Sequence, residues 1–354
     1  MLLDPAGFRD VVSGRRSGLA AGALRAAMRV AEAPYALAMR ARNAAYDRGL
    51  LRSHCADVPV ISVGNLSVGG TGKTPLVEWI ARWFRHRDVP VGVVSRGYRA
   101  PAGAPNDEAL ELAQKLPGLP HVQNPDRLAA VRDIVARHGC RVVVLDDAFQ
   151  HRRIARDVDV VLLDALEPFG WDHVLPRGAL REPLVGLQRA DVIALSRSDA
   201  ISADQREAIR ARVRGLAPAA DWTELRHRPL GLLTAGGVLQ PLEPLAGRRV
   251  AAFCGIGNPA GFRHTLRALG CDVAAFRSFP DHHAYEPADL ADIEAWVADL
   301  HGVDTLLCTQ KDMVKLNLTA LGRWPLWAIP IGLEISAGRD RLEQHLERVT
   351  ERGG

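Results

Sequence analysis

The sequence predicts an α/β protein in which two α/β domains are joined by a β-hairpin linker and preceded by amphipathic helices. Three observations predict this class. From residue 56 onward, short runs of β-branched and aliphatic residues alternate with longer helical stretches. The runs are apolar throughout, which is typical of parallel strands that are buried on both faces. The length of 354 residues exceeds that of a usual single domain, so two domains are expected.

The composition excludes several other classes of protein. The chain is 47% hydrophobic and 24% charged, which excludes a disordered or collagen-like protein. Five scattered cysteines without a CxxC pair argue against a zinc ribbon or a disulfide framework, and they fit a reducing compartment. No apolar run reaches the roughly 18 residues that a membrane span needs, and no signal-peptide cleavage pattern is present. We therefore expect a cytoplasmic protein that is not integral to a membrane.

Residues 1–55 are predicted to form basic amphipathic helices. Two Ala-rich helical stretches cover 19–33 and 35–51, and Pro34 is expected to break the helix between them. Residues 1–52 carry nine arginines and four acidic residues, a net +5 in a chain whose total is +4. Such a segment suits either an anionic membrane surface or a solvated face of helices packed on the main domain. Nucleic acid is not expected, because no aromatic interleaving, helix-turn-helix or RNP pattern accompanies the arginines.

The first domain, residues 56–221, contains the strongest local signal. An expected strand at 58–63 is followed by a Gly-rich loop and a helix. In such a P-loop, backbone N–H groups bind phosphates, the lysine contacts the β- and γ-phosphates, and the Ser/Thr hydroxyl ligates Mg²⁺. Ser67 stands where the strict pattern has glycine. The expected nucleotide-binding residues are Gly69, Gly70, Thr71, Gly72, Lys73 and Thr74.

A second metal-binding element follows in the same domain. The apolar strand expected at 141–145 ends in Asp146 and Asp147. A carboxylate at the carboxyl end of a strand beside the P-loop holds Mg²⁺ in P-loop enzymes. Adjacent residues of a strand point to opposite faces, so one aspartate is expected at the metal and the other elsewhere. The remaining strands of this domain are expected at 90–94, 159–163 and 191–195.

The rest of the chain is predicted to be a linker and a second domain. Residues 222–247 read as two strands with a turn at Gly236-Gly237, a β-hairpin linker. The second α/β domain, 248–354, has expected strands at 250–254, 273–276, 304–308 and 326–330. Its Gly255-x-Gly257-x-x-Ala260 pattern lacks the acidic residue that a dinucleotide site needs at the end of the next strand. We therefore interpret that pattern as a turn that opens a helix.

Several segments together resemble the tetraacyldisaccharide 4'-kinase (lipid A 4'-kinase) family and occur in the family's order. They are VGNLSVGGTGKTP (63–75), SRGY (95–98), NDEA (106–109), NPDR (124–127), DDAFQH (146–151), LPRGALREP (175–183), FCGIGNPAGF (253–262), FPDHHAY (279–285) and TQKDMVKL (309–316). Ser67 also fits this family's loop. The chain departs from the usual motifs at four positions, namely Asn106, Ala109, Ala148 and Gln310.

The resemblance implies an activity and a location. It implies transfer of the γ-phosphate of ATP, with Mg²⁺, to the 4'-hydroxyl of a tetraacylated glucosamine disaccharide 1-phosphate in lipid A biosynthesis. It also implies a nucleotide site in the cleft between two α/β domains and an N-terminal helix that associates with the membrane. The expected protein is thus a peripheral enzyme, a monomer, at the cytoplasmic face of the anionic inner membrane.

The resemblance also implies roles for individual residues. Lys73 and Asp107 are expected to be catalytic, with Asp107 as the general base assisted by His282 or His283. The residues leave open which histidine pairs with Asp107, with a slight preference for His282. A nucleotide-base contact, an interdomain pair and an ordinary salt bridge all remain open for Lys311. The expected substrate-binding residues are Asn65, Arg127, Gln150, His151 and Arg181.

Two other functions remain open at this point. The first is a P-loop GTPase or metal-chaperone regulator: TQKD and SRSD (196–199) superficially resemble the guanine-binding N/T-K-x-D motif, but both miss its spacing or residues. A small-molecule kinase with a merely structural N-terminal segment is the other alternative. Nucleotide preference and activity on the lipid substrate separate these functions.

Overall fold

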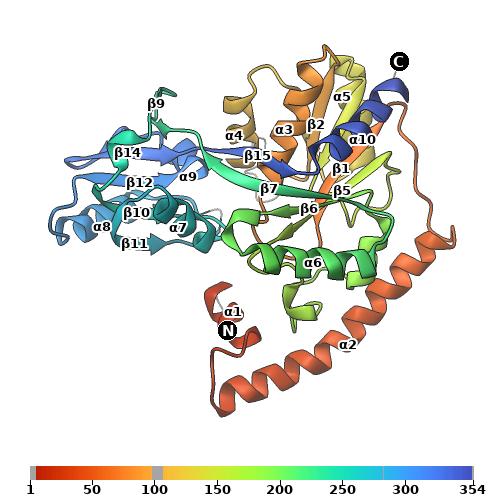
Figure 1. Ribbon diagram of the computed structural model, residues 1–354, viewed down its shortest axis with the longest axis horizontal. Helices are drawn as coiled ribbons and strands as arrows, with labels where there is room; N and C mark the ends of the chain where they lie inside the picture. Colours follow the sequence, from red (N-terminus) through yellow and green to blue (C-terminus); the bar gives the residue numbers. More distant parts are fainter. Residues whose placement is uncertain (1–4, 98–106, 282, 353–354) are drawn as a thin grey trace. The chain divides into compact units, whose positions relative to one another are not determined.

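The structure is a computed structural model that describes residues 5–97, 107–281 and 283–352 (Figure 1). Its contacts divide the chain into two compact units. The P-loop unit comprises residues 1–96, 119–226 and 335–354, and the C-terminal unit comprises 97–118 and 227–334. The chain therefore passes between the units more than once, and the predicted α/β class is confirmed in both.

The P-loop unit is built on an eight-stranded sheet with the order β15-β7-β6-β5-β1-β4-β2-β3. The central pairs are parallel, and every residue of β1, β2, β4, β5 and β6 is buried, so both faces of the sheet are covered. The strands are β1 (Val60–Asn65), β2 (Val91–Ser95), β3 (His121–Gln123), β4 (Val142–Asp146), β5 (Val158–Asp164), β6 (Val192–Ser196), β7 (Asp221–Pro229) and β15 (Ile331–Ala337). The strands that the sequence predicted in this domain are confirmed.

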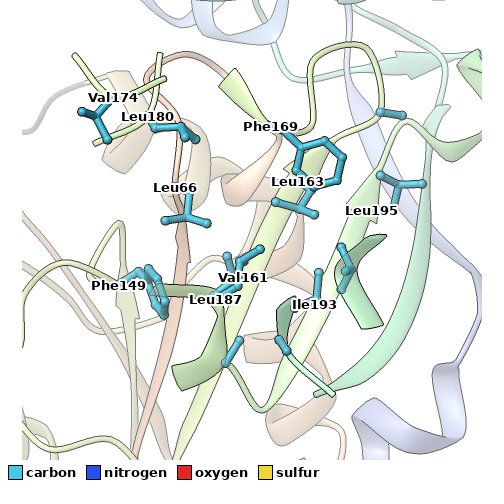
Figure 2. Packing of buried hydrophobic residues seen from close by; sticks show 14 residues of the cluster. Leu66, Phe149, Val161, Leu163, Phe169, Val174, Leu180, Leu187, Ile193 and Leu195 are labelled. Carbon is cyan, nitrogen blue, oxygen red and sulfur yellow. The ribbon is translucent and has the colours of Figure 1, made fainter. Parts of the chain in front are cut away.

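Helices and short 3₁₀ turns cover this sheet. The hydrophobic cluster in Figure 2 joins strands β5 and β6 to helix α6 and to the segments that follow β1 and β4. Leu66 and Phe149, both almost fully buried, belong to this cluster. Leu66 anchors the backbone just before the glycines of the P-loop, and Phe149 anchors it just after Asp147. The helical elements are α3 (Lys73–Arg85), α5 (Arg127–His138), η1 (Gly170–Asp172), η2 (Leu184–Arg189), η3 (Ser198–Ala200), α6 (Ala203–Leu216) and α10 (Arg339–Arg352).

The C-terminal unit contains a seven-stranded sheet with the order β11-β10-β12-β14-β8-β9, in which β13 pairs with β14. The strand pairs from β11 to β14 are parallel, and the predicted strands of this domain are confirmed. The strands are β8 (Leu232–Leu233), β9 (Leu239–Gln240), β10 (Arg249–Cys254), β11 (Asp272–Ser278), β12 (Thr305–Thr309), β13 (Ala320–Leu321) and β14 (Trp324–Ile329). The helical elements are α4 (Asp107–Lys115), η4 (Glu243–Leu245), α7 (Pro259–Ala268), α8 (Pro287–Ala298) and α9 (Gln310–Leu316).

The segment interpreted as a hairpin linker is divided between the two sheets. Its turn lies at Gly236-Gly237 as predicted: β8 and β9 pair antiparallel, and Gly237 has a φ of 77°. The part before the turn differs, because β7 pairs in parallel with β6 in the sheet of the P-loop unit. Burial of Thr223 and Leu225 on this strand explains why it joins that sheet.

Helix α4 belongs to the C-terminal unit, although the sequence division placed its residues in the first domain. It packs on α9, and Gln310 Nε2 donates to Gln114 Oε1 at 3.4 Å. Lys115 pins its other end: the buried ammonium pairs with Glu111 at 2.9 Å and donates to the carbonyl of Ile331 at 3.1 Å. Gln114 and Gln310 are 196 positions apart in the sequence, so α4 joins this unit through side-chain contacts that periodicity does not reveal.

The N-terminal segment forms α1 (Pro5–Val12) and one long helix, α2 (Leu19–Asp47). The expected break at Pro34 is wrong, because α2 runs through it. An interior proline costs about 3 kcal/mol, but the Ala-rich turns on both sides favour the helix. The next residue, Tyr35, also anchors it by donating its hydroxyl to the carbonyl of Arg181 at 2.7 Å. Among the described residues no helix is both long and apolar enough to cross a bilayer.

Candidate active site

The P-loop connects β1 to the first turn of α3. Gly69 and Gly72 have φ values of 118° and 86°, a region that glycine enters without steric cost. Gly72 is the N-cap of α3, so Lys73 and Thr74 are the first two residues of the helix. The free N–H groups and the positive end of the helix dipole favour an anion at this position. The loop therefore has the geometry of a phosphate site.

Asn65, at the end of β1, ties this loop together. Its side chain is completely buried. The amide Nδ2 donates to the carbonyl of Ser67 at 2.7 Å, and Oδ1 accepts from Lys73 Nζ at 3.3 Å. The structure thus gives Asn65, which was expected to bind substrate, a role in holding the loop and its lysine.

Asp146 and Asp147 lie at the end of β4, directly beside β1, where Val63 pairs with Asp146. Asp147 leaves the strand with a φ of 53°, and its Oδ1 accepts from Arg181 Nη1 at 2.7 Å and lies 3.4 Å from Lys73 Nζ. Burial raises the pKa of Asp147, but Lys73 and Arg181 lower it by more, to about 2. Asp147 is therefore ionised and engaged by two cations, whereas Asp146 is the last residue of the buried strand.

The oxygen donors at this place fit a magnesium ion bound together with a nucleotide. Within the described residues there is no cluster of three His, Cys, Asp or Glu side chains that could hold a metal alone. Magnesium at a nucleotide does not need one, because it takes one or two carboxylates, a hydroxyl, waters and phosphate oxygens. Thr74 and the two aspartates offer oxygen donors of this kind.

Gln150 accepts from Arg181 Nη1 at 3.5 Å and lies beside a buried carboxylate that sequence reasoning missed, Glu182. Gln150 Nε2 donates to the carbonyl of Asn65 at 2.9 Å and to Glu182 Oε1 at 3.1 Å. Glu182 is 2% exposed and also accepts from Asn43 of α2 at 2.7 Å and from Arg189 at 2.8 and 2.9 Å. The available signal was its place between Arg181 and Pro183 in LPRGALREP.

His151 and Arg127 lie in the same unit near the end of β4. Burial lowers the pKa of His151 to about 4, and the neighbouring Arg127, Arg153 and Arg156 lower it in the same direction. The imidazole is therefore neutral at physiological pH. Arg127 is the first residue of α5, is 2% exposed and donates Nη1 to the carbonyl of Asn124 at 2.9 Å. Its charge lies within range of Asp146 and Asp147.

The other expected catalytic residues belong to the C-terminal unit. Asp107 is the first residue of α4, but its side chain and all of His282 lie outside the part that the structure describes. His283 Nε2 lies 3.0 Å from Asp289 Oδ2. Its ring stacks on Phe279 at a centroid distance of 4.8 Å and meets Tyr285 edge-on at 5.0 Å. Lys311 is the second residue of α9, the helix on which α4 packs.

The glycine pattern at 255–257 serves an internal purpose. Gly255 N–H donates to the buried carboxylate of Asp312 at 3.0 Å, and Asp312 also accepts from Tyr285 and Thr309. Asn258 then caps α7 by accepting from Gly261 N–H. This agrees with a turn that opens a helix, because the amide that would face a pyrophosphate is bonded to a carboxylate.

Comparison with known proteins identifies the family. A model of the tetraacyldisaccharide-1-P 4'-kinase family (LpxK) matches residues 24–351. The chain belongs to this family. The tetraacyldisaccharide 4'-kinase of Anaeromyxobacter dehalogenans strain 2CP-C is 42% identical over 341 residues, covering 90% of this chain and 88% of the relative. That of Syntrophus aciditrophicus is 37% identical over 336 residues, covering 88% and 89%.

A solved structure agrees with this assignment. The Aquifex aeolicus LpxK crystal structure, described as a complex with ATP, matches with a TM-score of 0.70 and 29% identity over 92% of this chain and 99% of that one. Membership of the family makes the protein a kinase of lipid A biosynthesis and confirms the resemblance that the motifs indicated. The alternative of a GTPase regulator is thereby excluded.

Proposed function

We propose that the protein transfers the γ-phosphate of ATP to the 4'-hydroxyl of a tetraacylated glucosamine disaccharide 1-phosphate. The observation that carries the proposal is the P-loop beside β4. There Lys73 and Thr74 open a helix, and Asp146 and Asp147 end the adjacent strand. The family's activity supplies the acceptor.

In this proposal the P-loop residues bind the polyphosphate of ATP. Lys73 is 14% exposed at its side chain and paired with Asp147, so its ammonium is held beside the loop before any phosphate arrives. Thr74 and Asp146 would hold Mg²⁺, because Asp147 is already engaged by Lys73 and Arg181. When bound, Mg²⁺ offsets the negative charge of the phosphate groups.

The acceptor hydroxyl is deprotonated, in this proposal, by Asp107 with help from a histidine. The contacts of His283 favour His282 as that histidine. The Nε2 atom of His283 is engaged by Asp289, and its ring is held between Phe279 and Tyr285. We assign His283 to positioning the loop and His282 to assisting Asp107. Lys311 would contact the nucleotide.

The sugar and its 1-phosphate would be bound by residues near the end of β4. Arg127 and Arg181 offer planar guanidinium groups, which suit phosphate and hydroxyl oxygens. Neutral His151 and the amide of Gln150 add donors and acceptors without charge. Asn65 would contribute by holding Gln150 in place, because its backbone carbonyl accepts from Gln150 Nε2.

The exposed side of α2 supports a peripheral attachment to the anionic cytoplasmic face of the inner membrane. Leu19, Val30 and Leu37 are 96%, 75% and 67% exposed and recur at helical spacing on one side. Arg29 and Arg40 are exposed next to this stripe. Exposed leucine and valine flanked by arginines are typical of helices that lie in a lipid headgroup region. We propose that a monomer docks through this stripe.

A phosphoryl-transfer assay tests the proposed function. The full chain is incubated with tetraacyl disaccharide 1-phosphate, ATP and Mg²⁺ in detergent micelles, and the 4'-phosphorylated product is detected by mass spectrometry. Product should form with ATP and should be lost in Lys73→Ala. Absence of product with the wild-type protein, or equal product in Lys73→Ala, would refute the proposal. Tight GTP binding with hydrolysis that needs no lipid would refute it as well.

A further inference from the structure

The SRSD segment, which matched a guanine motif only in part, places an arginine under the P-loop. Arg197 directly follows β6 and adopts a left-handed conformation with φ 56° and ψ 39°. It is 5% exposed although it carries a full charge. A buried cation in a backbone region that arginine rarely adopts is costly, so its contacts need an explanation.

The guanidinium of Arg197 holds two partners at once. Its Nε donates to Asp164 Oδ1 at 2.9 Å, and its Nη2 donates to Asp164 Oδ2. The same Nη2 donates to the carbonyl of Gly70, in the P-loop, at 3.0 Å. Asp164 ends β5, is 9% exposed and also accepts the N–H of Leu166 at 3.1 Å. A fixed carboxylate therefore orients a planar cation, and that cation holds one P-loop carbonyl.

Holding the carbonyl of Gly70 also sets the direction of the next N–H. In a planar trans peptide the C=O of one residue and the N–H of the next point in opposite directions. The N–H of Thr71 must therefore point away from Arg197. Glycine allows the adjacent peptide to rotate more freely than other residues do. The orientation of the Gly70–Thr71 peptide therefore depends on a hydrogen bond from outside the loop. P-loop N–H groups bind phosphate oxygens.

We infer that Arg197, oriented by Asp164, is a positioning residue that fixes the Gly70–Thr71 peptide of the P-loop in the orientation that binds nucleotide phosphate. The inference rests on the proposed binding of ATP by this loop. Arginine suits the role because its fork spans two acceptors in one plane. The single nitrogen of lysine cannot reproduce that planar bidentate geometry.

Titration of the full chain with MgATP by calorimetry tests this inference. Without the hydrogen bond to the carbonyl of Gly70, Arg197→Met should weaken MgATP binding about tenfold, which corresponds to about 1.4 kcal/mol. Arg197→Lys, which keeps the charge, should fall between that variant and the wild type. The matched control is Arg206→Met, because Arg206 donates to the carbonyls of Ser198 and Ile201 in the same turn without reaching the P-loop.

The readouts separate positioning from a general loss of structure. In steady-state kinetics the KM for ATP should rise about tenfold in Arg197→Met while kcat changes less than about threefold. Arg206→Met should bind MgATP within twofold of the wild type. If Arg197→Met fails to fold, Arg197→Lys decides. Wild-type affinity in every folded Arg197 variant would overturn the inference, whereas a wild-type protein that does not bind MgATP would instead overturn the proposed function.

Discussion

Replacing Glu182 by glutamine should destabilise the P-loop unit strongly. Glu182 is 2% exposed, and its two carboxylate oxygens accept from Arg189, Asn43 and Gln150. Glutamine keeps the volume but removes the charge and replaces one acceptor oxygen by a donor. The new NH₂ group would then face a side-chain N–H donor of Arg189, Asn43 or Gln150, and no hydrogen bond could form there. The substitution leaves Arg189, itself mostly buried, without its counter-charge.

The expected loss of unfolding free energy follows from the burial of this ion pair. Burial lowers the pKa of Arg189, and Glu182 opposes that effect, so the arginine is charged and depends on this partner. Removing one member of a buried ion pair costs about 3–5 kcal/mol, since the other charge stays buried and unpaired. The pair of Arg212 with Asp172 gives a matched comparison in the same unit. Its side chains are 43% and 52% exposed, so its loss should cost at most about 1 kcal/mol.

Urea unfolding followed by circular dichroism measures both effects. Glu182→Gln should shift the unfolding transition by the equivalent of about 3–5 kcal/mol, and Asp172→Asn by less than about 1 kcal/mol. The reasoning is refuted if the two variants shift the transition equally. It is also refuted if Glu182→Gln lies within 1 kcal/mol of the wild type, because the carboxylate would then contribute no more than an exposed one.

Three further predictions concern catalysis, acid stability and the membrane. Lys73→Ala and Asp107→Ala should each lower kcat about 10²-fold or more in the micelle assay, and near-wild-type turnover in Asp107→Ala would remove it from the role of base. The pKa of His151 in the folded state is about 4, below its ordinary value near 6.5, so the folded protein binds this proton less readily than the unfolded chain does. Stability should therefore fall between about pH 6.5 and 4, and the melting temperature of His151→Gln should fall less than that of the wild type over this range. Val30→Ser/Leu37→Ser should weaken sedimentation with anionic vesicles and leave MgATP binding unchanged, and equal loss of both would contradict docking through α2.

The strands and the phosphate loop could be predicted because their signals are local. A buried parallel strand needs a continuous apolar run, and such runs occur at 141–145 and 159–163, where β4 and β5 lie. The P-loop likewise needs particular residues at fixed spacing between a strand and a helix. The adjacency of β1 and β4 followed from the requirement that a metal-binding aspartate end the strand beside the loop.

Other features depend on contacts between distant residues and could not be read from local patterns. Glu182 acts through Asn43, which precedes it by 139 residues, and Arg197 acts through Gly70, which precedes it by 127. In a chain with 41 arginines, a single arginine carries little information until its partners are known. At Pro34 a local signal gave a wrong prediction. The tendency of proline to end a helix was outweighed by the helical turns around it and by the hydrogen bond of Tyr35.

The membership of α4 in the C-terminal unit bears on how the proposed base is positioned. Asp107 begins α4, and His283 lies in the loop between β11 and α8. Both belong to the C-terminal unit. Lys115 fixes the far end of α4 to the carbonyl of Ile331, and Lys315 of α9 donates to the carbonyl of His283 at 3.3 Å. Since α9 packs on α4, a single helix supports both the base-bearing helix and the histidine loop. In the proposed mechanism, these contacts inside one unit would hold the helix of Asp107 and the histidine loop in place before the substrate binds. The proposed mechanism thus assigns proton transfer to residues of the C-terminal unit and phosphate binding to the P-loop, so substitutions in the two units should affect different steps.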